Sequence, residues 1–246
     1  MPCGSADSVG LGMSMATDTG RIGSDELLAE TALHAGQPAP AAIAAQLRSD
    51  IVHGVIEGGS RMRQDAVATR FGVSQNTARE AFKQLEAEGF LRSEPRRGVS
   101  VAPLSAEEAR EITELRALLE VQALGWALSA PKPSSFDAAQ RILAQLDNAK
   151  TVNTIIALNA AFHRTLYEPA ARSRTLALIE NLRLNFERYL RLTWEETAHL
   201  SQSQLQHHEI LRLCRAGASK QATELLHEHI WDTGQLLIGR LKKRSM

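Results

Sequence analysis

The sequence has few cysteines, few aromatic residues, no long apolar run and no excess of charge of either sign. Its two cysteines, Cys3 and Cys214, cannot build a framework of several disulfides, and they favour a reducing compartment such as the cytoplasm. No stretch approaches the roughly 18 consecutive apolar residues of a membrane-spanning helix, so a membrane span is excluded. The first residues lack a basic segment followed by an apolar one, so we expect no secretory leader.

The charge balance does not argue for nucleic-acid binding. Lysine and arginine together number 28, and aspartate and glutamate together also number 28. Residues 38–104 contain nine basic and seven acidic side chains, which is only a weakly basic balance, and residues 1–37 are acidic. Because a strongly basic patch is the usual electrostatic sign of a DNA-binding domain, a DNA-binding role must rest on motifs instead.

Hydrophobic patterning predicts a tail followed by two domains. Residues 1–37 are rich in Gly, Ser and Met and show no sustained period, so we expect a disordered tail with at most a short helix after Ser24. Residues 38–104 combine helical periods with a hairpin pattern, and residues 105–246 show helical periods only. The expected fold is mostly α: a helical domain with a small β-hairpin at 38–104 and an all-helical domain of six or seven helices at 105–246.

The first of these domains has the element order of a winged helix-turn-helix. The predicted elements are a helix with Ile43, Leu47, Ile51 and Val55 inward that Gly58-Gly59 ends, helices over 64–71 and 74–88, and a hairpin of 90–93 with 98–101. Gly72 breaks the chain between the second and third helices, and Ser74 can cap the third. In this arrangement the third helix lies across the DNA major groove.

Polar side chains point outward from the predicted third helix once its apolar face is assigned to the core. The candidate DNA-contacting residues are Gln75, Asn76, Thr77, Arg79 and Lys83 on that helix, Arg63 before the second helix, and Arg96, Arg97 and Gly98 at the hairpin tip. Arginine can bind guanine bidentately, and glutamine and asparagine can bind adenine. The alternative is that these side chains are simply solvated, since helix-turn-helix patterns also occur by chance in helical proteins.

A family resemblance favours the DNA-binding interpretation. The segments that carry it are Gly59-Ser60-Arg61-Met62, AVATRFGVS at 66–74, AREAF at 78–82, Leu85, EGFL at 88–91 and RRGVSV at 96–101. In order and spacing they resemble the GntR family of bacterial transcription regulators. The resemblance implies a homodimer that docks on a palindromic double-stranded DNA operator, with Arg79 and Gly98 at family motif positions. Gln75 and Arg63 depart from the usual pattern, so the base preference at Gln75 is left open.

The second domain directs several polar side chains into its apolar helical faces. Helices are predicted at about 105–129, 134–149, 151–168, 172–197, 201–216 and 218–242. Asn159 and His163 share one inward face, and His207 and His229 lie on the inward faces of two further helices, whereas His208 and His227 lie off these faces. The histidines are either separate core residues, each with its own hydrogen bond, or ligands of one divalent metal ion. Spacing alone leaves both alternatives open.

A second resemblance favours the metal site. The segment LNAAFHRTLY at 158–167 is similar to the (D/N)-x-x-F-H-x-x-L segment of the FadR-like C-terminal domain, and His207 and His229 match that domain's later histidines. The resemblance implies a metal ion (Zn, Ni, Mn or Fe) held by Asn159, His163, His207 and His229, next to a small organic or sugar acid as effector. Arg116 matches an arginine that could bind the effector's carboxylate, and the alternative for Arg116 is a surface ion pair with Glu120 at i+4.

These features together predict a cytoplasmic, ligand-responsive transcription regulator without catalytic residues. A metal-dependent enzyme is the main rival, because three histidines with open positions can also activate water. No Asp, Glu, Lys or Tyr is expected on the inward faces as a general base, and Tyr167 is predicted to lie off the face. A purely protein-binding helical module would leave the pattern of 59–101 unexplained. The short, Pro-containing connection at 102–106 should transmit reorientation between the domains.

Overall fold

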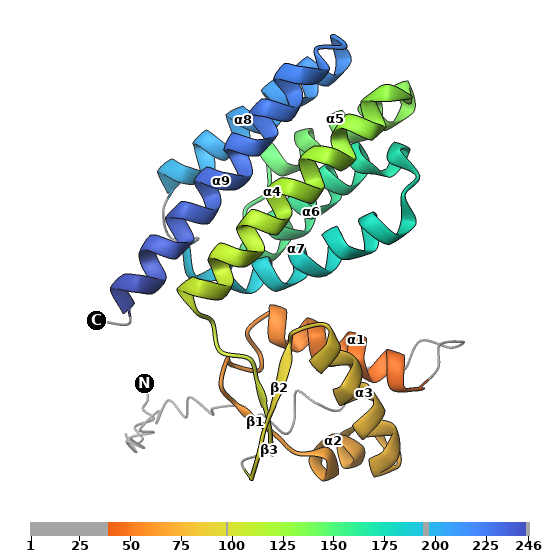
Figure 1. Cartoon of the computed structure of the whole chain (residues 1–246), viewed down its shortest axis with the longest axis vertical. Helices are drawn as coiled ribbons and strands as arrows, with labels where there is room; N and C mark the ends of the chain where they lie inside the picture. Colours follow the sequence, from red (N-terminus) through yellow and green to blue (C-terminus); the bar gives the residue numbers. More distant parts are fainter. Residues whose placement is uncertain (1–38, 97, 194–196, 245–246) are drawn as a thin grey trace, which may run out of the picture. The chain divides into compact units, whose positions relative to one another are not determined.

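The computed structural model describes residues 39–96, 98–193 and 197–244 (Figure 1). The predictions for the tail at 1–37 and for Arg97 fall outside these residues. No helix within the described ranges is long and apolar enough to cross a membrane.

The first part of the chain has the predicted winged helix-turn-helix order (Figure 1). Its helices are α1 (Ala39–Val52), α2 (Gln64–Phe71) and α3 (Gln75–Ala87), and its strands are β1 (Arg61–Met62), β2 (Leu91–Glu94) and β3 (Gly98–Val101). Gly72 adopts a left-handed conformation with φ of 63° at the end of α2, so the chain can turn directly into α3. Ser74 caps α3 by accepting a hydrogen bond from the Thr77 amide, as predicted.

The first helix is shorter than its apolar pattern predicts. It ends at Val52, and the amides of Val55 and Ile56 both donate to the Asp50 carbonyl oxygen, at 2.8 and 3.2 Å. Gly54 has φ of 74° and reverses the chain there. The prediction that Val55 points inward is therefore wrong, since 58% of its surface is exposed.

The wing is a three-stranded antiparallel sheet with strand order β1-β3-β2. Ser100 on the central strand pairs with Arg61 on one side and with Arg92 on the other. The predicted hairpin of β2 and β3 is confirmed, and β1 is an additional strand. Its two residues are too few to show the alternating pattern by which a strand is recognised in a sequence.

A separate apolar core holds the winged helix-turn-helix together. Helices α1 and α3 contribute Ile43, Leu47, Ala78, Phe82 and Leu85, all at most 2% exposed. Arg48 on α1 binds both carboxylate oxygens of Glu88, at the end of α3, at 2.8 Å each. This bidentate pair adds a geometric constraint to the apolar contact, because a guanidinium and a carboxylate fit in one plane. It ties α1 to the carboxyl end of α3.

The remainder of the described chain is helical, as predicted, and forms a bundle of six α-helices (Figure 1). They are α4 (Ala106–Ser129), α5 (Pro133–Asp147), α6 (Val152–Tyr167), α7 (Ser173–Thr193), α8 (Thr197–Arg215) and α9 (Ser219–Arg244), with a short 3₁₀ helix, η1 (Glu168–Ala170), after α6. Ser105 caps α4 by accepting from the Glu108 amide. The exact division into domains at residue 104 stays a prediction, since the described residues on both sides belong to one compact unit.

Helices α4 and α9 are in close contact at a glycine, Gly234. A Cβ atom added to Gly234 on α9 would lie only 2.2 Å from Cγ2 of Thr113 on α4. Thr113 is fully buried, and its hydroxyl donates to the Ala109 carbonyl oxygen at 2.6 Å. The contact therefore requires a residue without a side chain at position 234.

Candidate DNA-reading surface and histidine site

Helix α3 presents a polar face to solvent while its apolar face packs on the core. Of the residues predicted to contact DNA, Arg63, Gln75, Asn76, Arg79, Lys83, Arg96 and Gly98 are exposed and Thr77 is partly exposed. Ser74 uses its side chain to cap the first turn, so the amino end of the 13-residue helix is ordered and open to solvent. An amino-terminal helix end attracts phosphate through its free amides and its dipole. The face therefore offers groups for both base edges and backbone.

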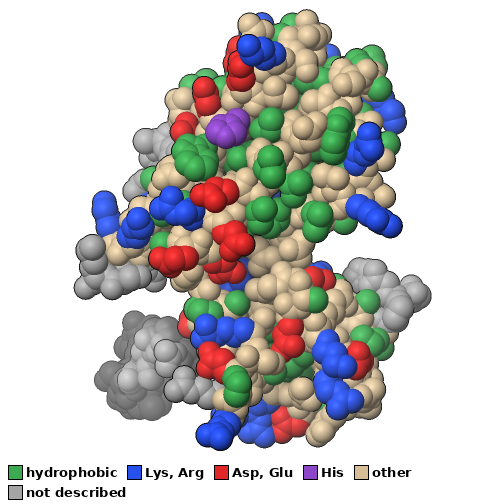
Figure 2. Space-filling model, in the orientation of Figure 1, with side chains coloured by type: hydrophobic (Ala, Val, Ile, Leu, Met, Phe, Trp, Pro, Cys, Tyr) green, Lys and Arg blue, Asp and Glu red, His purple; other side chains and the backbone are tan. Residues whose placement is uncertain are grey.

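Several basic side chains on this surface have neighbouring partners in the absence of DNA. Arg79 donates to the Asn76 side-chain oxygen, Lys83 lies 3.0 Å from Glu80, and Arg63 lies 2.6 Å from Asp65. The Arg63 guanidinium lowers the pKa of Asp65 to about 2. Figure 2 likewise shows basic and acidic side chains interspersed over the lower part of the molecule. DNA phosphates would have to replace these exposed pairs, each of which contributes little to stability.

The wing turn places basic groups around a glycine. Arg96 and Gly98 both have positive φ, at 67° and 82°, which brings β2 sharply round into β3. The guanidinium of Arg61, on β1, lies beside Gly98, with Nη2 3.7 Å from where a Cβ would be. Arg61 is exposed and belongs to the same tip as Arg96, although sequence reasoning did not single it out. The strand β1 that carries it was not visible in the pattern.

The helical bundle brings three of the predicted metal ligands together. His163 on α6, His207 on α8 and His229 on α9 are at most 5% exposed, and one ligand nitrogen from each lies within 4.8 Å of the other two. The His207 and His229 ring centroids are 4.5 Å apart, and His163 lies 5.1 and 5.2 Å from them. His208 and His227 lie outside this cluster, as predicted. Spacing had left separate core histidines as an alternative, and the structure shows a cluster.

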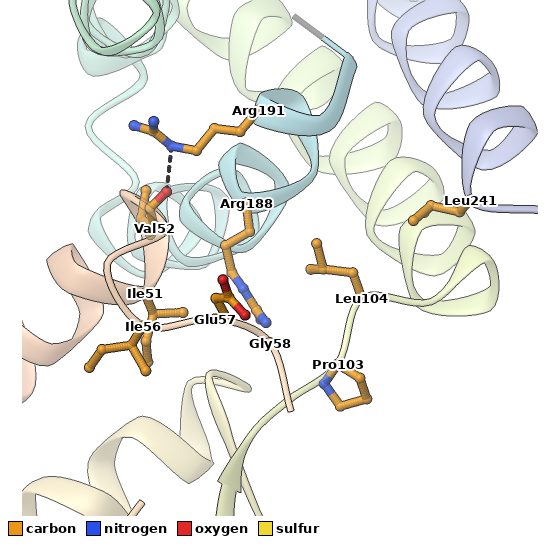
Figure 3. A pocket seen from close by; sticks show the side chains of 11 residues that line it. Ile51, Val52, Ile56, Glu57, Gly58, Pro103, Leu104, Arg188, Arg191 and Leu241 are labelled. Atoms are coloured by element: carbon orange, nitrogen blue, oxygen red, sulfur yellow. Dashed lines mark hydrogen bonds between the residues drawn. The ribbon is translucent and has the colours of Figure 1, made fainter. Parts of the chain in front are cut away.

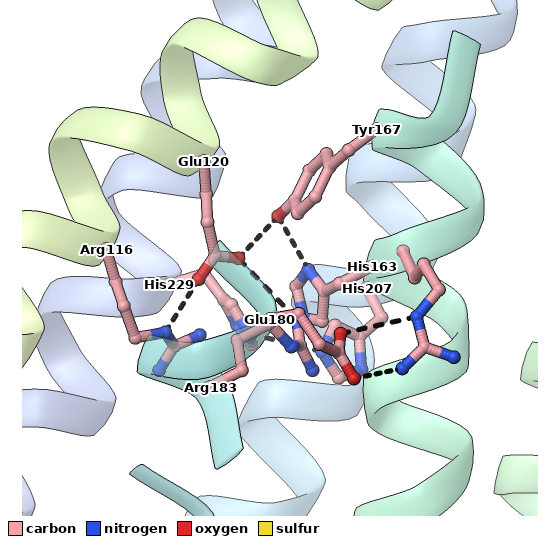
Figure 4. Close-up of polar contacts among 9 residues, drawn as sticks. Arg116, Glu120, His163, Tyr167, Glu180, Arg183, His207 and His229 are labelled. Atoms are coloured by element: carbon pink, nitrogen blue, oxygen red, sulfur yellow. Dashed lines mark hydrogen bonds and ion pairs between the residues drawn. The ribbon is translucent and has the colours of Figure 1, made fainter. Parts of the chain in front are cut away.

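Hydrogen bonds determine which nitrogen of His163 carries the proton. The Tyr167 hydroxyl donates to Oε2 of Glu120 at 2.8 Å, so its oxygen is available to accept from Nδ1 of His163 at 3.0 Å (Figure 4). Burial and the Glu120 charge raise the pKa of Tyr167 well above its usual value, which keeps the hydroxyl protonated. With its proton on Nδ1, His163 directs the lone pair of Nε2 into the cluster. That Nε2 atom is buried and has no hydrogen-bond partner among residues 39–96, 98–193 and 197–244.

A relay of the same kind orients His207. Asp147, the last residue of α5, accepts from Nε2 of Gln204 at 2.7 Å, which turns Oε1 of Gln204 toward His207. Because an amide oxygen only accepts, His207 must donate from Nδ1, at 3.0 Å. The lone pair of His207 Nε2 consequently points into the cluster, as does that of His163.

His229 also donates from Nδ1 to the side-chain oxygen of a glutamine. Nδ1 of His229 lies 3.0 Å from Oε1 of Gln206, so Nδ1 carries the proton and Nε2 is the lone-pair nitrogen. Nε2 of His229 lies only 3.2 Å from Nε2 of His207. Two lone pairs that face each other at this distance repel, and a cation between the rings would relieve the repulsion. This arrangement, together with the unpartnered Nε2 of His163, is what a site for a metal ion requires.

Burial also keeps the cluster in the form that binds metal. Burial, followed by the charge of Arg183, lowers the pKa of His163 well below its usual value, and burial and His229 do the same for His207. Both rings are thus neutral near pH 7, as ligands must be. Asn159, the predicted oxygen donor, lies one turn before His163 on α6 and is partly buried. Its membership of the ligand set stays a prediction.

A buried ionic network adjoins the histidines (Figure 4). Glu120 is fully buried, and its Oε1 accepts from Nε of Arg116 at 2.6 Å while Oε2 lies 3.5 Å from Nη1 of Arg183. Burial raises the pKa of Glu120, but Arg116 and Arg183 outweigh it, so that the net pKa is lowered. The Arg116–Glu120 pair is therefore present, although it is buried rather than on the surface. The prediction that Tyr167 lies off the inward face is wrong, since it is only 1% exposed and contacts His163.

Arg183 connects this network to a surface cavity. The cavity has a volume of about 330 Å³ and lies between α6 and α7, where Arg164, Tyr167, Glu168, Leu176, Ile179, Glu180 and Arg183 line it. Arg164 and Glu180 form an ion pair at its edge. Within the described part of the chain, Nε and Nη1 of Arg183 are buried without hydrogen-bond partners, and only the longer ion pair of Nη1 with Glu120 balances the charge of this guanidinium. Sequence reasoning did not identify Arg183.

Two protein-family models match the chain. The model described as "Bacterial regulatory proteins, gntR family" matches residues 40–101, which contain the winged helix-turn-helix. The model described as "FCD domain" matches residues 111–232, which include all three clustered histidines. The two matches thus cover both candidate sites.

Similar proteins match over most of the chain. The HTH-type transcriptional regulator BphR of Paraburkholderia xenovorans (strain LB400) is 30% identical over 198 residues, which are 75% of this chain and 79% of BphR. The HTH-type transcriptional repressor RspR of Escherichia coli (strain K12) is 26% identical over 209 residues, or 84% and 92% of the two chains. The solved structure of E. coli McbR/YncC has a TM-score of 0.72 at 21% identity, covers 83% and 99% of the chains, and shows the fold alone. The curated relatives are transcription regulators, not enzymes.

Proposed function

Because the chain belongs to the GntR family of bacterial regulatory proteins and carries an FCD domain after its DNA-binding domain, we propose that it acts as an effector-controlled homodimer on a palindromic operator. The family identifies it as a DNA-binding transcription regulator. The proposal adds the dimer, the symmetry of the operator and control by a small carboxylate near a divalent metal ion. A regulator of this kind acts on the chromosome, so we assign it to the cytoplasm.

The polar face of α3 carries the DNA-reading part of the proposal. Arg79 and Gln75 lie on the exposed side of a capped helix, where they can reach base edges in the major groove. Arg96, at the wing tip, is positioned to contact phosphate or the minor groove. In a dimer each α3 would read one half-site, and binding of the first makes binding of the second effectively intramolecular.

The histidine cluster carries the metal part of the proposal. His163, His207 and His229 would hold the ion through Nε2, with Asn159 as an oxygen donor from the same helix as His163. Three neutral imidazoles and an amide leave the full positive charge of the ion uncompensated, so the ion would attract an anion to its open positions. Zinc, nickel, manganese and iron all suit such a donor set.

The effector part rests on the arginines beside the cluster. An organic or sugar acid could enter from the cavity between α6 and α7 and bind Arg183, whose Nε and Nη1 have no hydrogen-bond partner among the described residues. Arg116 binds Glu120 through Nε at 2.6 Å, and its remaining guanidinium donors could bind the effector as well. The effector's carboxylate would thus share these cations with an internal carboxylate.

Helix α7 offers a route from the effector to the reading head. Arg183 lies in the ionic network, and on the same helix Asn185 donates to the Glu88 carbonyl oxygen at 2.9 Å, at the end of α3. Arg188 donates to the carbonyl oxygen of Ala102, in the connection between β3 and α4. A shift of α7 upon effector binding would move these contacts and hence α3. The change in DNA affinity cannot exceed the effector's preference for one arrangement over the other.

The experiment starts from the DNA, because neither operator nor effector is needed in advance. Duplexes selected from a random pool by the purified protein should share an inverted repeat, and failure to enrich any duplex at low salt would reject the DNA-reading proposal. Metal content and duplex affinity are then compared for His207→Ala and for His227→Ala, an exposed histidine outside the cluster. We expect His207→Ala alone to lose metal while both bind the duplex. Loss of duplex binding by a folded, dimeric His207→Ala protein would contradict the separation of roles.

A further inference from the structure

A second cavity lies away from the histidine cluster, where the DNA-binding domain meets the bundle (Figure 3). It has a volume of about 590 Å³, within the range of small-molecule pockets. The turn after α1, the connection between β3 and α4, and helices α7 and α9 all contribute to its lining. None of the proposed metal ligands lines it.

Two arginines give this cavity its charge. Arg188 is only 5% exposed, and its Nη1 is buried with no hydrogen-bond partner in the ranges that the structure describes. Arg191 donates to the Val52 carbonyl oxygen and to the side-chain oxygen of Asn153, at 2.6 Å each. Among the ion pairs between described residues, neither guanidinium is paired with a carboxylate. Because arginine stays charged in proteins, the cavity holds two cations with no direct counter-ion.

The burial of Arg188 is costly unless something compensates for it. Burial lowers the pKa of Arg188 below its usual value, and the charge of Glu108 offsets this effect only in part. Glu57 is the only acidic side chain among the described lining residues, and it is exposed rather than bound to Arg188. An oxyanion from solution would supply the missing acceptor for Nη1.

The rest of the lining is apolar. Ile51, Val52, Ile56, Pro103, Leu104 and Leu241 line the cavity beside the two arginines. An inorganic anion would leave these surfaces in contact with water, whereas an anion with an apolar body would cover them. The chemistry of the cavity thus specifies an amphipathic ligand.

We propose that this cavity is a second ligand site, which binds a small carboxylate with a short apolar body. Its oxyanion pairs with Arg188 and Arg191, and its apolar body lies against Ile56 and Leu104. A ligand there contacts the α1 turn, the connection to α4, and α7 at the same time. It therefore stabilises the arrangement in which α7 holds the Ala102 carbonyl oxygen, independently of the metal site.

Hexanoate, acetate and 1-hexanol serve as probes for the two parts of the site. Each buried methylene strengthens binding by about fourfold, so hexanoate should bind at least about tenfold more tightly than acetate by titration calorimetry. Hexanol lacks the charge and should bind at least about tenfold more weakly than hexanoate. Equal binding of hexanoate and hexanol, or no hexanoate binding at millimolar concentrations, would overturn the proposal.

A variant that fills the cavity tests whether hexanoate binds there. Gly58 lines the cavity and does not have a positive φ. A Cβ atom at this position would lie 3.7 Å from the carbonyl oxygen of Ala102, which is an ordinary contact distance. Gly58→Met should fold and fill the cavity, lowering hexanoate affinity at least about tenfold. Gly125→Met is the matched control, because open space surrounds Gly125 on α4. Hexanoate binding should persist in both Gly125→Met and His207→Ala.

The outcomes also separate this site from the proposed effector site. Binding that is lost in His207→Ala and kept in Gly58→Met would place hexanoate at the histidine cluster and overturn the second site. Unchanged affinity in Gly58→Met would overturn it as well. Glu57→Gln removes the acidic side chain at the cavity and should tighten hexanoate binding severalfold, and unchanged or weaker binding would contradict the pairing with the arginines.

Discussion

Replacement of Tyr167 by phenylalanine tests whether the hydrogen bonds around the histidines prepare them for a metal ion. The Tyr167 hydroxyl is the atom that accepts from Nδ1 of His163 and donates to Glu120. Without it, nothing holds the His163 proton on Nδ1, and the proton can move to the nitrogen that faces the cluster. Loss of an outer partner of a ligating histidine typically costs about 10- to 100-fold in metal affinity, or roughly 1.4–2.8 kcal/mol.

The chain offers a matched control in its second tyrosine. Tyr189 is also fully buried, lies in the same bundle and donates to a glutamate, Glu108 on α4. Each Tyr→Phe variant removes one hydrogen bond from a carboxylate, that of the buried Glu120 or that of the partly buried Glu108, so each should lower the free energy of unfolding by about 1–3 kcal/mol. Only Tyr167→Phe should lower metal affinity, because Tyr189 contacts none of the three histidines in the contacts that the structure describes.

The assay is a competition for Zn²⁺ between the protein and a chromogenic chelator at fixed pH, with urea unfolding of the metal-free proteins alongside. We expect similar losses of stability and a difference of about 10- to 100-fold in zinc affinity between the variants. If Tyr167→Phe and Tyr189→Phe bind zinc as tightly as each other, the inference that Tyr167 sets the tautomer of His163 is refuted.

The remaining predictions concern the reading head, the metal charge and the bundle. Arg79→Ala should weaken binding to a selected duplex by about 1–3 kcal/mol in anisotropy titrations and leave binding to a scrambled duplex unchanged. Equal losses of binding free energy on both duplexes would mean that Arg79 contacts only phosphate. Arg96→Ala should weaken binding to all duplexes and reduce the slope of log affinity against log salt, and an unchanged slope would exclude a phosphate contact. Asn159→Asp should retain metal better and bind an anionic effector less tightly, as metal analysis and calorimetry can measure; equal occupancy and equal affinity would refute a ligand role. Gly234→Ala should lower the free energy of unfolding in urea by about 1–3 kcal/mol, because its Cβ would overlap Thr113. An unchanged free energy of unfolding would show that α4 and α9 can move apart without cost.

The fold was predictable from the sequence because its signals are local. Ser74 and Ser105 are N-capping residues that mark the starts of α3 and α4. The apolar faces of the bundle helices repeat regularly enough to locate all six helices. The failures are also local. The end of α1 depends on a turn around Gly54 that competes with a continuing apolar pattern, and β1 is too short to have a pattern.

The site was only partly predictable, because helical periods give the direction of a side chain but not the helix that it meets. They indicate that His163, His207 and His229 point inward, yet they do not show that the three converge. Tyr167 could have been found, since it lies four residues after His163 and so shares its face. Arg183 could not be found in this way, because its partner Glu120 lies on another helix. Both residues are charged, and charged residues are normally expected on the exposed face of a helix.

Three hydrogen bonds from α7 to the DNA-binding domain are directed at the main chain. Asn185, Arg188 and Arg191 bind carbonyl oxygens of Glu88, Ala102 and Val52, and every amino acid in those places would present the same acceptor. These hydrogen bonds do not depend on the side chains of Val52, Glu88 and Ala102, so substitutions at those positions would leave the acceptors in place. Chimeras that join this helical bundle to the winged helix-turn-helix of another regulator with the same backbone should therefore keep all three hydrogen bonds.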